Sequence, residues 1–194
     1  MIVAVIPTRY APPDLGHLVA ALATDGVLVV VVPSSEYEHA IYRMWNEGVR
    51  LARAAGATEI AVLNDDVWLP KGALPFLAGA LRSADDVGVV YPDVTWDGEL
   101  PQHVALTSTS GTWGAGGMTG FAFLFRAEIV QPFDEAFHWW YGDDAFERGV
   151  REQGWRVCRV NGVGCRHQAN GSAGKDWDRL APLIAKDRER WDAA

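Results

Sequence analysis

The chain has 194 residues, 49% of them apolar, and a formal net charge of -8 at pH 7. This length supports one well-packed core and is too short for two ordinary domains, so we expect a single domain. The negative charge argues against broad attraction to a polyanion such as nucleic acid, because phosphates are contacted mainly by Lys and Arg.

The apolar segments are short. None approaches the roughly 20 residues that a membrane-spanning helix needs, and the N-terminus lacks the basic start and long apolar middle of a signal peptide. A soluble, cytoplasmic protein is therefore expected. Cys158 and Cys165 are too few for a disulfide framework and form no zinc-binding spacing, so they are predicted to be reduced, packed thiols.

The first third of the chain alternates short apolar strands with amphipathic helices. Strands are predicted at residues 2–6, 27–32 and 60–63, and helices at 15–25 and 36–55. Such an alternation is typical of an α/β domain with a mainly parallel sheet flanked by helices.

Ligands of such sheets bind beyond the carboxyl ends of the strands, and the loop after the third strand is acidic. It contains Asn64, Asp65 and Asp66. Buried carboxylates are costly unless they meet a cation or hydrogen-bond donors, and a divalent metal that bridges a diphosphate would meet that need. A loop with a helix cap is the alternative.

The rest of the chain is less regular but contains no repeat and no linker. Helices are predicted from Pro70 to 81, at 143–154 and at 175–191; strands are predicted at 87–91, 121–125, 155–160 and 163–166. Between them, residues 108–117 form a stretch rich in Ser, Thr and Gly.

Six segments in chain order carry a family resemblance: VIPTRY, WNEGVRLARAAGA, LNDDV, GMTGFAFLFRAEI, FDEAFHWWYGDD and CRHQANGS. Together they resemble family 2-like glycosyltransferases with the GT-A fold, especially rhamnosyltransferase-like members. The resemblance implies a single domain over residues 1–194, with the nucleotide sugar and metal in about 1–92 and the acceptor and catalysis in about 93–194. It also implies metal-dependent, inverting transfer of a sugar from a nucleoside-diphosphate sugar to an acceptor hydroxyl.

The resemblance assigns the donor side residue by residue. Asp66 is the best direct ligand of Mn²⁺ or Mg²⁺, Asp65 helps to hold the metal or the sugar, and Asn64 replaces the commoner first Asp and would contact ribose or sugar hydroxyls. His167 matches a His that approaches the metal and diphosphate. Ser172 and nearby backbone amides could donate to phosphate oxygens.

Further donor contacts follow from position in the family pattern. Asn46 matches an Asn-x-Gly helix, and Thr8 and Arg9 are candidate nucleotide contacts. Relatives carry an Asp-rich turn after the second strand, whereas this chain has VVVPSSE. Ser34 and its two following residues could contact the base there, so the identity of the nucleotide stays open.

The later acidic pair, Asp143 and Asp144, resembles the acceptor-side motif in which one carboxylate deprotonates the attacking hydroxyl. Adjacent carboxylates push one pKa upward, as a general base near neutral pH requires. We favour Asp144 as the base and Asp143 as its positioning partner, although the order could be reversed and Asp143 could simply cap a helix. The preceding Trp139, Trp140 and Tyr141 could form an aromatic wall for the acceptor or pack in the core.

Several alternatives stay open. The glycine-rich segment 114–120 could close over the donor or be only a permissive loop. The chain could instead be a nucleotidyltransferase that makes sugar nucleotides, or an inactive sugar-nucleotide-binding module. A glycan, lipid, protein or modified DNA base could be the acceptor.

Overall fold

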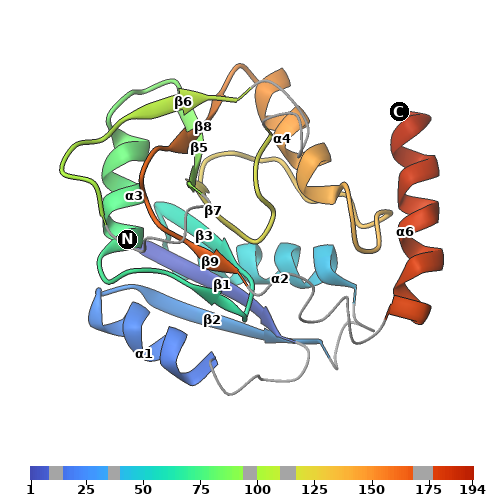
Figure 1. Cartoon of the computed structure of the whole chain (residues 1–194), viewed down its shortest axis with the longest axis horizontal. Coiled ribbons are helices and arrows are strands. Elements are labelled where there is room, and N and C mark those ends of the chain that lie inside the picture. Colours follow the sequence, from blue (N-terminus) through green and yellow to red (C-terminus); the bar gives the residue numbers. More distant parts are fainter. Residues whose placement is uncertain (9–14, 35–39, 94–99, 110–116, 168–176) are drawn as a thin grey trace.

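A seven-stranded sheet forms the centre of the molecule in the computed structural model, which describes residues 1–8, 15–34, 40–93, 100–109, 117–167 and 177–194 (Figure 1). Its strand order is β2-β1-β3-β7-β5-β8-β6. The strands are β1 (Ile2–Thr8), β2 (Leu28–Pro33), β3 (Glu59–Leu63), β5 (Val87–Pro92), β6 (Leu106–Ser108), β7 (Ala122–Arg126) and β8 (Arg156–Val160).

The sheet is mainly parallel, as predicted. Strands β2, β1, β3, β5 and β8 run in one direction, whereas β7 is antiparallel to both of its neighbours, β3 and β5, and β6 is antiparallel to β8. The start of β7 therefore lies at the edge where β1 and β3 end. Leu63 at the end of β3 pairs with Ala122 at the start of β7.

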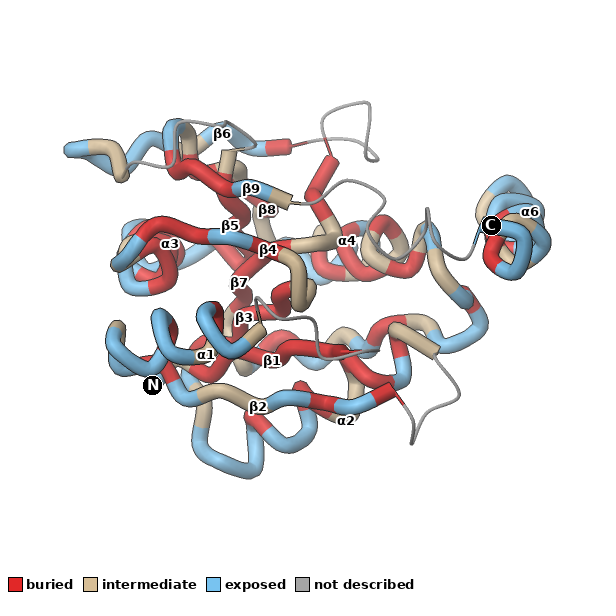
Figure 2. The backbone as a smooth tube through the Cα atoms, turned by 60° about the horizontal axis from the view of Figure 1, so that its bottom comes forward, coloured by how far each residue is buried: buried red, intermediate tan, exposed pale blue. Residues whose placement is uncertain are grey.

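Helices cover both faces of this sheet (Figures 1 and 2). They are α1 (Leu15–Thr24), α2 (Ile41–Ala54), α3 (Ala73–Arg82) and α4 (Gly142–Glu152). Successive side chains of a strand point to opposite faces. Accordingly, Ala4 and Ile6 of β1 join the apolar cluster with α1 and α3, whereas Val3 and Val5 join the cluster with α2 and α4.

Two elements lie outside these layers. A small antiparallel ribbon pairs β4 (Val67–Trp68) with β9 (Arg166–His167) and sets Val67 opposite His167. The C-terminal helix α6 (Trp177–Asp192) stands at one end of the molecule, beyond α4 (Figures 1 and 2). No helix in the described segments is long and apolar enough to span a membrane.

The structure corrects several predicted boundaries. The helix predicted at 36–55 is α2, which begins at Ile41, and residues 35–39 lie outside the described part. The helix predicted from Pro70 begins at Ala73. The strand predicted at 163–166 is β9, which spans Arg166–His167 and overlaps the prediction only at Arg166. Strands β4 and β6 were not predicted, because two and three residues are too short to show a period. Both cysteines are free and buried, as predicted.

Candidate functional site

The ends of β1 and β3 bring two predicted donor-side residues together. These strands are parallel neighbours, so the residues that follow them meet at one edge of the sheet. The Thr8 hydroxyl donates a hydrogen bond of 2.7 Å to Asp65 Oδ2. Asp65 is thereby fixed between β1 and the loop after β3.

Asp66, Asn64 and His167 form a second contact at the same edge. His167 Nε2 lies 3.2 Å from Asp66 Oδ1 and 3.3 Å from Asn64 Nδ2. The β4–β9 ribbon explains the approach, because it places His167 across from Val67, the residue after Asp66. The predicted partnership of Asp66 with His167 is thus seen as a spatial contact.

The donor atoms at this corner fit a divalent cation. Asn64 Oδ1 and Asp66 Oδ1 are buried and have no hydrogen-bond partner among the described residues. The His167–Asp66 contact is close enough for an ion pair but lacks hydrogen-bond geometry, so it does not satisfy the Asp66 oxygen. Buried polar atoms are normally paired, and oxygen with imidazole nitrogen is a ligand set that Mn²⁺ accepts.

The protein alone would supply an incomplete coordination shell. Within the described segments, no group of three or more His, Cys, Asp and Glu side chains could hold a metal ion. Phosphate oxygens of a ligand commonly complete the shell of Mg²⁺ or Mn²⁺ in such sites. The residues therefore fit a metal that is held together with a diphosphate.

The segment before β7 joins this corner to the later acidic pair. The Phe121 ring stacks on the His167 ring, with centroids 4.4 Å apart and planes 6° from parallel. Its neighbour Gly120 lies against Asp143, where any Cβ would collide with the carboxylate. The two acidic motifs, far apart in sequence, thus flank two consecutive residues.

The second motif lies in the first turn of α4. Asp144 is buried and Asp143 is half-buried. Burial and, next, the Asp144 carboxylate raise the pKa of Asp143 to about 7, and this outweighs the opposing effect of backbone amides at the helix start. Asp143 is therefore poised to gain or lose a proton near neutral pH.

Glu147, one helical turn after Asp143, holds the glycine-containing segment in place, and sequence reasoning did not single it out. Its carboxylate is buried and accepts hydrogen bonds from the Met118 amide (2.6 Å) and the Thr109 hydroxyl (3.0 Å). It is also paired with Arg151. An (i, i+4) Glu–Arg pair is common on exposed helices, so the sequence offered no signal that this one is buried.

The remaining predicted contacts are only partly described. Asn46 uses its amide to bond both the N–H and the C=O of Phe133 at 2.9 Å, so the structure does not bring it together with the acidic corner. Ser34 is buried just after β2. Arg9 and Ser172 lie outside the described residues, as do residues 114–116 of the predicted glycine-rich loop.

The aromatic residues before α4 divide by exposure. Trp140 is exposed, whereas Tyr141 stacks on Trp191 of α6 with ring centroids 5.6 Å apart. A surface hollow of about 590 Å³ lies nearby, between α4 and the end of α6. Its lining includes none of Thr8, Asn64, Asp65, Asp66 and His167. Its lining residues are Asp134, Phe137, Arg148, Lys186, Glu189, Arg190, Ala193 and Ala194.

Comparison with models of protein families and with curated proteins found no match. Solved structures do match. Staphylococcus aureus TarS 1–349 superposes with a TM-score of 0.63 at 13% identity, over 96% of this chain and 64% of that one. A Drosophila β1,4-galactosyltransferase 7 mutant in complex with manganese, UDP-Gal and xylobiose gives 0.56 at 17% identity, over 92% and 72%.

A third neighbour is the mannosyltransferase PcManGT from Pyrobaculum calidifontis, in complex with GDP-Man and Mn²⁺. Its TM-score is 0.61 at 14% identity, and the match covers 97% of this chain and 64% of that one. The chain thus spans less than two thirds of TarS 1–349 and of PcManGT. Two of these neighbours are named as glycosyltransferases, and the chain has the GT-A fold.

Proposed function

We propose that the chain is a metal-dependent glycosyltransferase that moves a sugar from a nucleoside-diphosphate sugar to an acceptor hydroxyl with inversion. The observation that carries this proposal is that both acidic motifs contact the segment before β7: the Asn64 backbone amide donates to the Phe121 carbonyl at 2.8 Å, and Asp143 lies against Gly120. One motif offers unpaired oxygens suited to a cation, and the other offers a carboxyl poised near neutral pH. The complexes of two fold neighbours with sugar nucleotides and manganese agree with this division.

Asp66 and His167 would hold Mn²⁺ or Mg²⁺, with Asn64 Oδ1 facing the same corner. When bound, the metal would stabilise negative charge on the departing nucleoside diphosphate. Asp65, held by Thr8, would position the metal or sugar. The same proposal includes the family 2, rhamnosyltransferase-like resemblance and nucleotide contacts by Arg9, Ser34 and Ser172, whereas Asn46 is left out because its amide binds Phe133.

On the acceptor side, one carboxylate of the Asp143–Asp144 pair takes the proton of the acceptor hydroxyl. The resulting oxygen attacks the anomeric carbon while the bond from that carbon to the diphosphate oxygen breaks. The sequence favoured Asp144 as the base and left the reverse open. Asp143 has a raised pKa and is more exposed than Asp144, and both features support Asp143 in that role. We therefore propose Asp143 as the base and Asp144 as its positioning partner.

Thermal shift tests the donor site without an acceptor. UDP, GDP and their sugar conjugates should raise Tm with Mn²⁺, because a ligand that binds only the folded state stabilises it. Asp66→Asn should abolish this metal-dependent shift. Asp85→Asn removes an equal charge from an exposed position before β5 and should retain the shift. If no nucleotide raises Tm with Mn²⁺, the glycosyltransferase proposal fails.

Product analysis then separates the alternatives. Release of a nucleoside diphosphate from the sugar nucleotide supports glycosyl transfer. Release of pyrophosphate from a nucleoside triphosphate and a sugar phosphate would identify a nucleotidyltransferase. Binding with no turnover across glycan, lipid, protein and modified-base acceptors would identify a binding module.

A further inference from the structure

The turn that leads into α4 is strained. Tyr141 has φ 66° and is the only non-glycine residue of the described segments in the left-handed region. For a residue with a Cβ, such a conformation is unfavourable and persists only where surrounding contacts enforce it. Asp143 and Asp144 follow within one helical turn, so whatever enforces this turn also sets where they lie.

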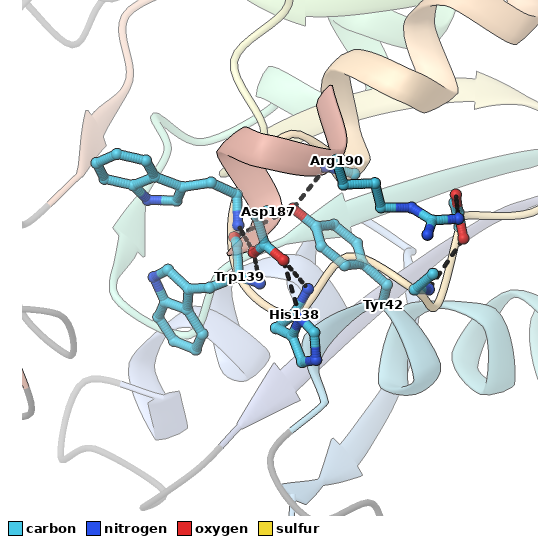
Figure 3. A network of polar contacts seen from close by, with 9 residues as sticks. Tyr42, His138, Trp139, Asp187 and Arg190 are labelled. Atoms are coloured by element: carbon cyan, nitrogen blue, oxygen red, sulfur yellow. Dashed lines mark hydrogen bonds and ion pairs between the residues drawn. The ribbon is translucent and has the colours of Figure 1, made fainter. Parts of the chain in front are cut away.

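Asp187 of α6 is the centre of the contacts that enforce it. Its carboxylate is buried and accepts hydrogen bonds from three consecutive backbone amides: His138 to Oδ1 at 2.8 Å, and Trp139 and Trp140 to Oδ2 at 2.7 and 3.0 Å. His138 Nδ1 lies 2.9 Å from Oδ1 as well. Figure 3 shows Asp187 pointing from α6 into the segment that carries His138 and Trp139.

Tyr42 of α2 contacts the same turn (Figure 3). Its hydroxyl donates to the Trp139 carbonyl at 3.1 Å and accepts from the Gly142 amide at 3.0 Å. Gly142 is packed so closely on the Tyr42 ring that a side chain there would collide with it. Burial raises the pKa of Tyr42 well above its ordinary value, so the hydroxyl keeps the proton that it donates.

We propose that Asp187 is a positioning residue: by binding three successive amides, it holds the turn before α4 in the conformation that aims Asp143 and Asp144. A buried carboxylate is costly without donors, and here the backbone of the turn supplies them. Helix α6 therefore belongs to the acceptor side of the molecule. The catalytic part of this inference rests on the proposed function, whereas the structural part does not.

Amide hydrogen exchange, resolved by NMR, tests the structural part. In the wild type, the amides of His138, Trp139 and Trp140 should exchange slowly. Asp187→Asn keeps the shape but leaves one oxygen in place of two, so at least one of these amides should exchange about tenfold faster, the factor that corresponds to roughly one hydrogen bond. Glu189→Gln, on the exposed side of the same helix, should leave all three unchanged.

Two results would overturn the inference. One is fast exchange of these amides in the wild type, which remains measurable even if Asp187→Asn does not fold. The other is equally slow exchange in the wild type and in Asp187→Asn. Tyr42→Phe is a second test. It should accelerate exchange at the Gly142 amide, whereas the three amides bound to Asp187 should stay protected.

Kinetics test the positioning role. With Mn²⁺ and a sugar nucleotide, release of nucleoside diphosphate to water should show kcat lowered about tenfold or more in Asp187→Asn, with KM for the donor within about twofold. An unchanged kcat would remove the catalytic role. If the wild type releases nothing from any sugar nucleotide, the proposed function fails, while exchange still decides whether Asp187 holds the turn.

Discussion

Burial and the charge of the neighbouring Asp144 carboxylate both raise the pKa of Asp143. Its folded pKa of about 7 compares with an ordinary value of 3.8, so between these pH values the folded chain binds a proton that the unfolded chain has released. The free energy of unfolding therefore falls as pH rises through this window. The destabilisation that ionised Asp143 causes is complete above about pH 7 and absent below about pH 4.

Asp143→Asn should therefore stabilise the protein at pH 8 and much less near pH 4.5. A shift of this size is equivalent to about 1–4 kcal/mol, once sharing of the proton with Asp144 is allowed for. Urea unfolding of both proteins at the two pH values measures the difference. Asp85→Asn, which removes an equal charge from an exposed turn, is the control. An equal effect of Asp143→Asn at both pH values would contradict the raised pKa.

Some residues of the site could be predicted from the sequence and others could not. The acidic pairs and His167 were found because strand ends and family-like motifs mark them. Their meeting at Gly120 and Phe121 could not be read from spacing, since it depends on how β7 enters the sheet. Asp187 has no local signal: it sits in a charged helical run where an exposed carboxylate is the ordinary expectation.

At the scale of elements, α2 lies close to the sheet because Gly48 faces β1. A Cβ at this position would collide with the Val5 side chain and lie 3.2 Å from Val32 Cγ2. Val5 is fully buried, so it has little room to move away. The small residue in WNEGVR therefore sets the distance between α2 and β1.

Gly48→Ala should destabilise the protein by about 1–3 kcal/mol, the usual cost of overpacking a core, despite the better helix propensity of Ala. Gly79→Ala is the matched control, because Gly79 lies on an exposed helical position with nothing near its Cβ. This control should gain roughly 0.5–1 kcal/mol. Urea unfolding at pH 7 measures both changes, and a Gly48→Ala protein as stable as the control would refute the close-packing account.

The order and type of the longer elements were predictable, because their apolar periods are local. The direction of β7 was not. Its buried run AFLFR reads the same whether a strand is parallel or antiparallel, since both faces are covered. The sequence thus predicted a mainly parallel sheet but not the antiparallel strand at its centre.

At the scale of the whole molecule, β7 interleaves the two halves assigned to donor and acceptor. It comes from the second half of the chain yet lies between β3 and β5, which both come from residues 1–92. Without β7, these two strands are not hydrogen-bonded to each other in the sheet. We therefore expect the two proposed halves to fold as one unit.

The isolated segment 1–92 should consequently fail to fold cooperatively, because β3 is buried along its whole length and would lose one neighbour. Far-UV circular dichroism and Trp fluorescence of this fragment should show no sharp urea transition, whereas the two signals should give coincident transitions in the full chain. Co-expression with segment 93–194 should restore that transition. A cooperative transition in 1–92 alone would instead mean that the donor half is an autonomous domain to which β7 is merely added.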